Sequence, residues 1–97
     1  MTEWEVKTHP EFSSDLDKLG KNELEIFYKK KEKIKANPLR LKHLSGGENC
    51  YREAITKNIR LVYYIEGNTI WFLVIGRHDE TYQEYFARLH SLRGLLQ

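Results

Sequence analysis

Two arginines, a histidine and a tyrosine stand near the ends of two consecutive apolar segments in the second half of the chain. Arg60 lies near the start of the first segment. Arg77 and His78 end the second segment, and Tyr82 follows within about one helical turn. Arginine can hold a phosphate through paired N–H donors, histidine exchanges a proton near neutral pH, and tyrosine does so when its pKa is lowered. These residue types can therefore act together on an RNA phosphodiester without a metal ion.

A metal centre or other cofactor is not expected. His78 and the two acids after it are consecutive, so their side chains point in different directions, and no second histidine cluster accompanies them. The single cysteine, Cys50, excludes an internal disulfide and a cysteine-rich zinc site. One unpaired cysteine also fits a reducing compartment.

The length and composition predict one soluble globular domain over residues 1–97. Hydrophobic residues make up 40% of the chain and charged residues 31%, a balance that excludes a disordered protein. The longest apolar run, residues 70–75, is too short to span a bilayer. The first residues have neither the basic nor the apolar region of a signal peptide, so we expect a cytoplasmic protein.

The positive charge is concentrated in one segment, although the net charge is only +2. Between residues 29 and 43 a single acid, Glu32, faces seven cations: Lys29, Lys30, Lys31, Lys33, Lys35, Arg40 and Lys42. The first seventeen residues are acidic instead. This distribution indicates a side that faces a polyanion. The alternative is a lysine-rich helix face that is merely solvated.

Before the basic segment, the sequence predicts a short strand and two helices. Residues 4–7 alternate apolar and polar side chains, as a strand does. Pro10 is expected to open the first helix, which has an apolar stripe, and Gly20 to stop it. Asn22 and Glu25 have the spacing of a capping box for the second helix, and Pro38 ends it. The two helices should form an antiparallel hairpin. The expected buried face of the second helix comprises Leu24, Phe27, Tyr28 and Ile34.

After a basic loop over residues 39–49, three strands and a helix are expected. The strands cover about residues 50–55, 59–66 and 69–77, and their short turns predict an antiparallel meander. In the second of these strands, residues 59, 61, 63 and 65 should point one way and residues 60, 62 and 64 the other. The last helix runs over residues 79–92, with Tyr82 on its apolar stripe. The fold is thus α+β, of order βααβββα, and a hairpin on one face would leave Arg60 on the open side.

The motifs of the second half resemble those of the RelE/ParE superfamily of bacterial and archaeal toxins. The resemblance rests on Arg60-Leu61-Val62-Tyr63 and on Gly76-Arg77-His78 followed by Tyr82. Asn49-Cys50-Tyr51-Arg52 is similar to RelE itself, and Leu41-Lys42-His43 with Ser45-Gly46 to the loop of the YoeB branch. The RelE/YoeB mRNA interferases are therefore the nearest branch. The resemblance implies a RelE-like microbial ribonuclease-type fold with an antiparallel-rich four-stranded sheet, an N-terminal helical hairpin on one face and a C-terminal helix.

This resemblance implies a toxin of a type II toxin–antitoxin system, with a cognate antitoxin as partner. RelE-like members bind in the ribosomal A site and cut mRNA without a metal, by attack of a ribose 2′-OH on the adjacent phosphate. ParE-like members inhibit DNA gyrase instead. A non-toxic relative that still binds an antitoxin is the third reading. None of these implies a membrane partner or a small-molecule cofactor.

The resemblance also assigns roles to residues. Arg60 matches the arginine that contacts the scissile phosphate, Arg77 and His78 the basic pair after the last strand, and Tyr82 the tyrosine that stacks on a base or joins proton transfer. Ala54 stands where RelE has a lysine, which favours chemistry based on His78. Tyr85 is the alternative tyrosine if the helix is rotated. The expected RNA-binding residues are Lys33, Arg40, Lys42, His43 and Arg52.

Overall fold

Seven elements follow one another in the predicted order βααβββα. The computed structural model describes residues 4–38 and 49–96. The elements are β1 (Glu5–Thr8), α1 (Phe12–Asp17), α2 (Lys21–Ala36), β2 (Cys50–Ala54), β3 (Ile59–Glu66), β4 (Thr69–Arg77) and α3 (His78–Leu96). The bounds of β2, β3 and β4 agree with the sequence prediction to within one residue, whereas α3 begins one residue earlier and ends later than predicted.

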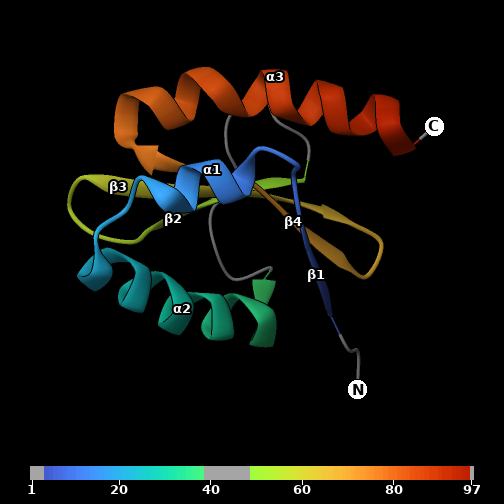
Figure 1. Cartoon of the computed structure of the whole chain (residues 1–97). Coiled ribbons are helices and arrows are strands. Elements are labelled where there is room, and N and C mark those ends of the chain that lie inside the picture. The colour runs from blue at the N-terminus through green and yellow to red at the C-terminus, as the bar shows by residue number, and fades with distance from the viewer. Residues whose placement is uncertain (1–3, 39–48, 97) are drawn as a thin grey trace.

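The four strands form one mixed sheet in the order β1-β4-β3-β2. β2, β3 and β4 form the predicted antiparallel meander. β1 pairs with β4 in the parallel direction, over Thr69 to Phe72 only. The second half of β4, residues 73–77, therefore has no neighbouring strand on that side among the residues that the structure describes (Figure 1).

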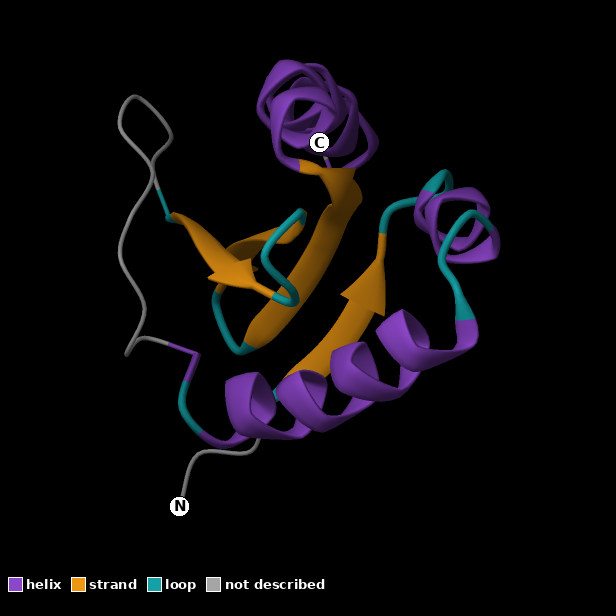
Figure 2. Cartoon of the chain, turned by 90° about the vertical axis from the view of Figure 1, so that its left-hand side faces the viewer, coloured by secondary structure: helices purple, strands orange, loops and turns teal. Residues whose placement is uncertain are grey.

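Each face of the sheet is covered by helices. α2 lies on one face of the sheet and α3 on the other, and α1 lies beside β4 and contributes to the same apolar cluster as α2 (Figures 1 and 2). The α1/α2 face packs Phe12, Phe27 and Ile34 against strand residues such as Leu61 and Phe72. A separate cluster on the α3 face consists of Cys50, Val62, Tyr64, Leu73, Val74, Tyr85, Leu89 and Leu92. Two apolar layers enclose the sheet, which explains why β4 is apolar on both faces.

The predicted alternation of β3 is confirmed. Leu61 and Tyr63 belong to the α1/α2 cluster, whereas Val62 and Tyr64 belong to the α3 cluster. The register with β4 shifts between Val62 and Tyr63, and the extra residue places Leu73 and Val74 on the same face. Such a bulge bends the strand locally.

Three sequence predictions about the N-terminal helices need correction. α1 begins at Phe12, because Pro10 lies in a preceding turn that is closed by a hydrogen bond from the Phe12 N–H to the His9 carbonyl. The start of α2 is capped by Glu23, whose Oε1 accepts the Gly20 N–H at 2.8 Å, instead of by a box between Asn22 and Glu25.

Tyr28, predicted to be buried, is 52% exposed. Phe27 and Ile34 already fill the contact of α2 with the sheet, at 2% and 0% exposure. Because successive helix residues are turned by about 100°, Tyr28 is directed away from the contact that Phe27 makes. The prediction of a buried side chain was therefore correct for Phe27 and wrong for its neighbour Tyr28.

Arg60 does not stand on an open face, because α3 covers β4 and β3 on that side. Arg60 is half-buried. The helix hairpin accounts for only one face, and the long apolar β4 needs a second cover, which the C-terminal helix supplies.

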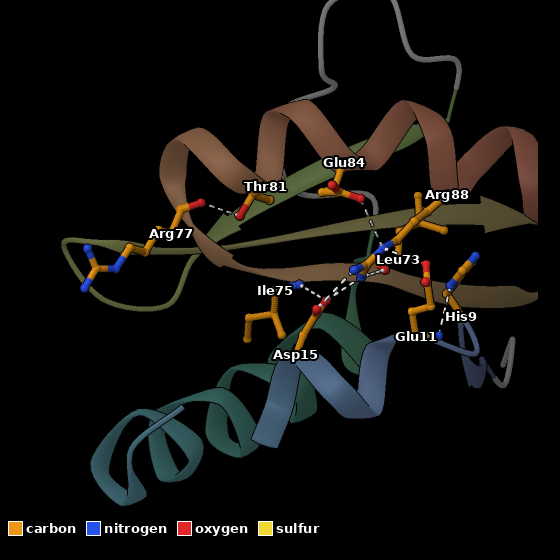
Figure 3. Close-up of polar contacts among 9 residues, drawn as sticks. All are labelled: His9, Glu11, Asp15, Leu73, Ile75, Arg77, Thr81, Glu84 and Arg88. Atoms are coloured by element: carbon orange, nitrogen blue, oxygen red, sulfur yellow. Dashed lines mark hydrogen bonds and ion pairs between the residues drawn. The ribbon is translucent and has the colours of Figure 1, made fainter. Parts of the chain in front are cut away.

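A buried ion pair closes the part of β4 that β1 leaves uncovered (Figure 3). Asp15 from α1 accepts the Ile75 N–H through Oδ2 at 3.2 Å. Arg88 from α3 donates to the Leu73 carbonyl through Nη1 at 2.9 Å. The two side chains also bind each other twice, through Nη1 and Oδ2 and through Nη2 and Oδ1. They take the place that a further strand would occupy, because backbone groups buried at a sheet edge need partners.

We expect Asp15→Ala to lower the free energy of unfolding by about 3–5 kcal/mol, since it leaves the Arg88 guanidinium buried without its carboxylate. Urea unfolding followed by circular dichroism measures this change. Glu84→Ala is the matched control, because Glu84 contacts the same guanidinium at 3.9 Å from an exposed position, where an ion pair contributes at most about 1 kcal/mol. Equal losses for the two variants would contradict the structural role of Asp15.

Candidate functional site

The register of β3 and β4 brings the two predicted strand arginines to the same end of the sheet. Arg60 lies opposite Gly76, and Arg77 lies opposite Ile59. The turn between β2 and β3 and the first residue of α3 lie at this end as well (Figure 1). The backbone therefore places Arg60, Arg77 and His78 within two residues of one another across the sheet.

The Arg60 guanidinium is held by the β2–β3 turn. Its Nη1 donates to the carbonyls of Thr56 at 2.6 Å, Lys57 at 3.0 Å and Ile59 at 3.2 Å. The Thr56 hydroxyl in turn accepts the N–H groups of Asn58 and Ile59. Within the described part of the chain, these bonds use one nitrogen of the fork, and Nη2 and Nε remain for another acceptor. The turn thus fixes the orientation of this arginine.

Small residues flank Arg60 on its own face of the sheet. Its neighbours in register are Ala54 on β2 and Gly76 on β4. Arg52 is exposed on β2 and lies opposite Val62, so it occupies the same face one step along the strands. Neither neighbouring strand therefore places a bulky side chain directly beside Arg60.

The Arg77 side chain projects from the α1/α2 face of the sheet, whereas the Arg60 side chain is on the α3 face. Residues in register point to the same side of a sheet, and its partner Ile59 belongs to the α1/α2 cluster. The Arg77 side chain is exposed and extends past the end of β4 (Figure 3). The two arginines are therefore close along the backbone, but their guanidinium groups start from opposite faces.

α3 continues β4 without a loop, so His78 follows Arg77 directly and Tyr82 lies one turn later. The Thr81 hydroxyl donates to the Arg77 carbonyl at 2.8 Å and ties this turn to the strand end. The side chains of His78 and Tyr82 lie outside the described part of the structure. Tyr85, the alternative to Tyr82, is only 4% exposed and packs in the α3 cluster, so it is a core residue.

The predicted RNA-binding residues are distributed over three parts of the chain. Lys33 is exposed on α2, which packs on the other face of the sheet from Arg52, since Arg52 lies opposite Val62 of the α3 cluster. Arg40, Lys42 and His43 lie outside the described residues. Both ends of their segment are attached to β3: the Tyr63 hydroxyl donates to the Pro38 carbonyl at 2.7 Å, and the Ile65 N–H donates to the Asn49 carbonyl at 2.9 Å.

A cleft of about 620 Å³ lies between α1, α3 and the uncovered half of β4. Sequence reasoning did not find it, because no local pattern marks Asp15 and Arg88 as partners. Acidic and basic side chains both line this cleft. Arg77 lies at one end of it, and the Asp15–Arg88 ion pair lies inside it. The lining residues are Glu11, Asp15, Lys18, Leu19, Glu23, Ile59, Val74, Ile75, Gly76, Arg77, Thr81, Glu84 and Arg88.

The ion pair perturbs two titratable groups. Burial alone would lower the pKa of Arg88, but the hydrogen bond and the attraction from Asp15 raise it overall. His9 is 4% exposed, and its Nδ1 accepts the Glu11 N–H at 3.1 Å. Burial, helped by the charge of Arg88, lowers the pKa of His9, and the opposite effects of Glu11 and Asp15 are weaker. The sequence assigned His9 no role; here it is a neutral core histidine.

Among the side chains that the structure describes, no group of three or more from His, Cys, Asp or Glu is arranged to hold a metal ion. No helix in residues 4–38 and 49–96 is long and apolar enough to cross a membrane.

No protein-family model matches the sequence, and no curated protein is similar to it at the sequence level. Solved structures do match. A double arginine-to-alanine mutant of the E. coli toxin RelE in the free state superposes with a TM-score of 0.77 at 22% identity, over 89% of this chain and 97% of RelE. The chain has the RelE fold.

Two toxin–antitoxin complexes contain the same fold. The toxin in the intact E. coli RelBE complex gives a TM-score of 0.69 at 22% identity, over 76% of this chain and 95% of that one. The E. coli DinJ–YafQ complex gives 0.69 at 15% identity, over 80% and 96%. The RelE fold predicted from the motifs is therefore confirmed, as is the α+β architecture.

His9 makes the stability of this RelE fold dependent on pH. Its pKa is lower in the folded chain than its ordinary value of 6.5, so between the two values the unfolded chain binds more protons and stability decreases as pH falls. We expect the urea midpoint to decrease as pH falls through 6.5, and the decrease to be smaller in His9→Gln. His90→Gln is the control, because His90 is exposed on α3. Identical pH profiles for wild type and His9→Gln would contradict the assignment.

Proposed function

We propose that this chain is the toxin of a type II toxin–antitoxin pair and acts as a ribosome-dependent, metal-independent mRNA endoribonuclease. The observation that carries the proposal is Arg60: a guanidinium fixed by a turn on a RelE fold, with small residues on both sides and two donor nitrogens available. Fixed donors aimed at developing charge are an effective source of transition-state stabilisation.

In the proposed reaction, Arg60 binds the oxygens of the scissile phosphate through Nη2 and Nε. A ribose 2′-OH loses its proton to a base and attacks the adjacent phosphorus. The O2′–P bond forms, the P–O5′ bond breaks, and the leaving oxygen takes up a proton. His78 is the residue proposed to exchange these protons, since histidine exchanges protons near neutral pH and His78 lies two residues along the chain from Gly76, the register partner of Arg60.

The remaining site residues have supporting roles in this proposal. Tyr82 stacks on a base of the mRNA or assists proton transfer. Arg77 and Arg52 bind flanking phosphates on either side of Arg60, and Lys33, Arg40, Lys42 and His43 extend the basic surface. The A site of the ribosome supplies the mRNA in the required conformation. No step needs a metal ion.

We further propose that a cognate antitoxin neutralises the chain in the cytoplasm. Structures of this fold include toxins crystallised with the antitoxins RelB and DinJ. An acidic, helix-rich partner would complement the basic residues of the site.

Arg60→Ala should decrease the rate of mRNA cleavage on programmed ribosomes by about 10²–10³-fold, because the phosphate loses its fixed donors. Primer extension on the translated mRNA measures the cuts. The matched control is Thr56→Val, which removes two hydrogen bonds of the same turn and leaves the guanidinium in place. If Thr56→Val lost as much activity as Arg60→Ala, the effect would come from the turn.

His78→Ala should decrease the same rate by roughly 10²–10⁴-fold, as expected for loss of an acid–base group. His90→Ala on the exposed side of α3 should cleave like the wild type. Intact messages with the wild-type protein, together with inhibited DNA supercoiling, would replace this proposal by gyrase inhibition. Intact messages and unaffected supercoiling would indicate a non-toxic relative.

A further inference from the structure

The outer edge of β1 is an unpaired strand edge. β1 is the last strand on its side of the sheet, in the order β1-β4-β3-β2 (Figures 1 and 2). Within the part of the chain that the structure describes, no strand pairs with β1 on its outer side. Glu5, Lys7 and Thr8 are exposed, and Val6 is half-buried. An exposed edge of this kind is a template on which another strand can pair.

The hydrogen bonds to β4 show which backbone groups of β1 point outward. The Glu5 N–H donates to the Asn68 carbonyl at 2.9 Å, and the His9 N–H donates to a β4 carbonyl at the same distance. Backbone groups alternate in direction along a strand, so the odd-numbered residues of β1 bond to β4. The N–H and C=O groups of Val6 and Thr8 therefore point to the outer edge, where the backbone of another strand can bind them.

The side chains along this edge carry opposite charges two residues apart. Glu5 and Lys7 lie on the α3 face, where the Lys7 Nζ is 5.5 Å from the centre of the Trp71 ring. Neither forms an ion pair with any residue that the structure describes. Val6 lies between them on the other face and packs against the α1/α2 cluster. The segment is therefore charged at both ends and apolar at its centre.

This segment is complementary to itself when two copies run antiparallel. A two-fold axis through Val6 places Glu5 of each copy opposite Lys7 of the other. The two Val6 residues then form a hydrogen-bonded pair, in which each N–H donates to the other carbonyl. Their side chains extend the two α1/α2 clusters across the interface. An axis through Glu5 or through Lys7 would place like charges opposite each other, so the charges select the register centred on Val6.

The competing interpretation is that the two charges protect the edge, because charged side chains on an edge strand usually prevent pairing. Such protection depends on like charges meeting, or on a charge meeting an apolar side chain. Neither occurs in the register centred on Val6. Glu5 and Lys7 thus disfavour pairing with unrelated strands and permit pairing with a second copy.

We propose that β1 is a homodimer interface, at which two copies of this chain pair antiparallel through Glu5–Thr8 and join their four-stranded sheets into one. The pairing leaves the candidate site open. β1 binds β4 at Thr69 to Phe72, whereas Arg60 lies on β3 opposite Gly76. A four-residue strand buries less surface than a standard interface, so the dimer should be weak, with a Kd between about 10 μM and 1 mM.

The test is sedimentation equilibrium of the full chain and of charge-reversal variants. Glu5→Lys and Lys7→Glu each place like charges on both sides of the axis and should raise the dimer Kd at least about 10-fold. The double variant, Glu5→Lys with Lys7→Glu, exchanges the two charges and should dimerise like the wild type. An equimolar mixture of the two single variants should form a heterodimer at concentrations where neither associates alone.

Two further variants separate strand pairing from a general effect of charge. Thr8→Pro removes an N–H that points outward, at an edge position where proline is tolerated, and should weaken the dimer. Lys21→Glu and Glu25→Lys are the matched controls, because they reverse exposed charges on α2 instead of β1. Both controls should dimerise like the wild type. Circular dichroism establishes that every variant is folded.

Several outcomes would overturn the interface. One is a wild type that stays monomeric at about 1 mM. Another is dimerisation of the single variants or of Thr8→Pro with the Kd of the wild type. A third is a mixture of the two single variants that stays monomeric, because the charges would then not face each other across a two-fold axis. None of these measurements uses RNA cleavage, so the interface and the proposed function stand or fail separately.

Discussion

The bidentate ion pair between Asp15 and Arg88 is the contact on which the arrangement of helices around the sheet depends. β1 is only four residues long, so the second half of β4 would present buried backbone groups without partners. Asp15 accepts the Ile75 N–H, Arg88 donates to the Leu73 carbonyl, and the two bind each other. A helix from each face of the sheet is thereby attached to the same strand edge.

This attachment also determines where the candidate chemistry lies. α3 is joined to β4 directly at Arg77 and His78, and it is held a second time at Arg88, about 15 Å further along its axis. Two fixed points give the helix one direction across the sheet. The first turn of α3, which begins at His78, is consequently kept at the strand end near Arg60, and Tyr82 follows one turn later.

Arg60 combines a structural and a proposed catalytic role through different atoms. Nη1 closes the β2–β3 turn, and the other two nitrogens of its fork are available on a face where Ala54 and Gly76 leave room. A planar guanidinium can serve both purposes because its donors point in fixed and different directions. A lysine at this position would offer all of its donors from one flexible nitrogen instead of a fixed planar fork.

The sequence by itself determined the strands, the alternation along β3 and the helix that follows Arg77, because these depend on period, turn residues and neighbours along the chain. The motifs around Arg60 and Arg77 also predicted the RelE fold. Only the tertiary structure decided that Arg77 leaves by the opposite face, that Tyr28 is exposed, and that Asp15 pairs with Arg88. That last pair is separated by 73 residues. A contact between such distant residues arises from packing of whole elements, and no local pattern carries it.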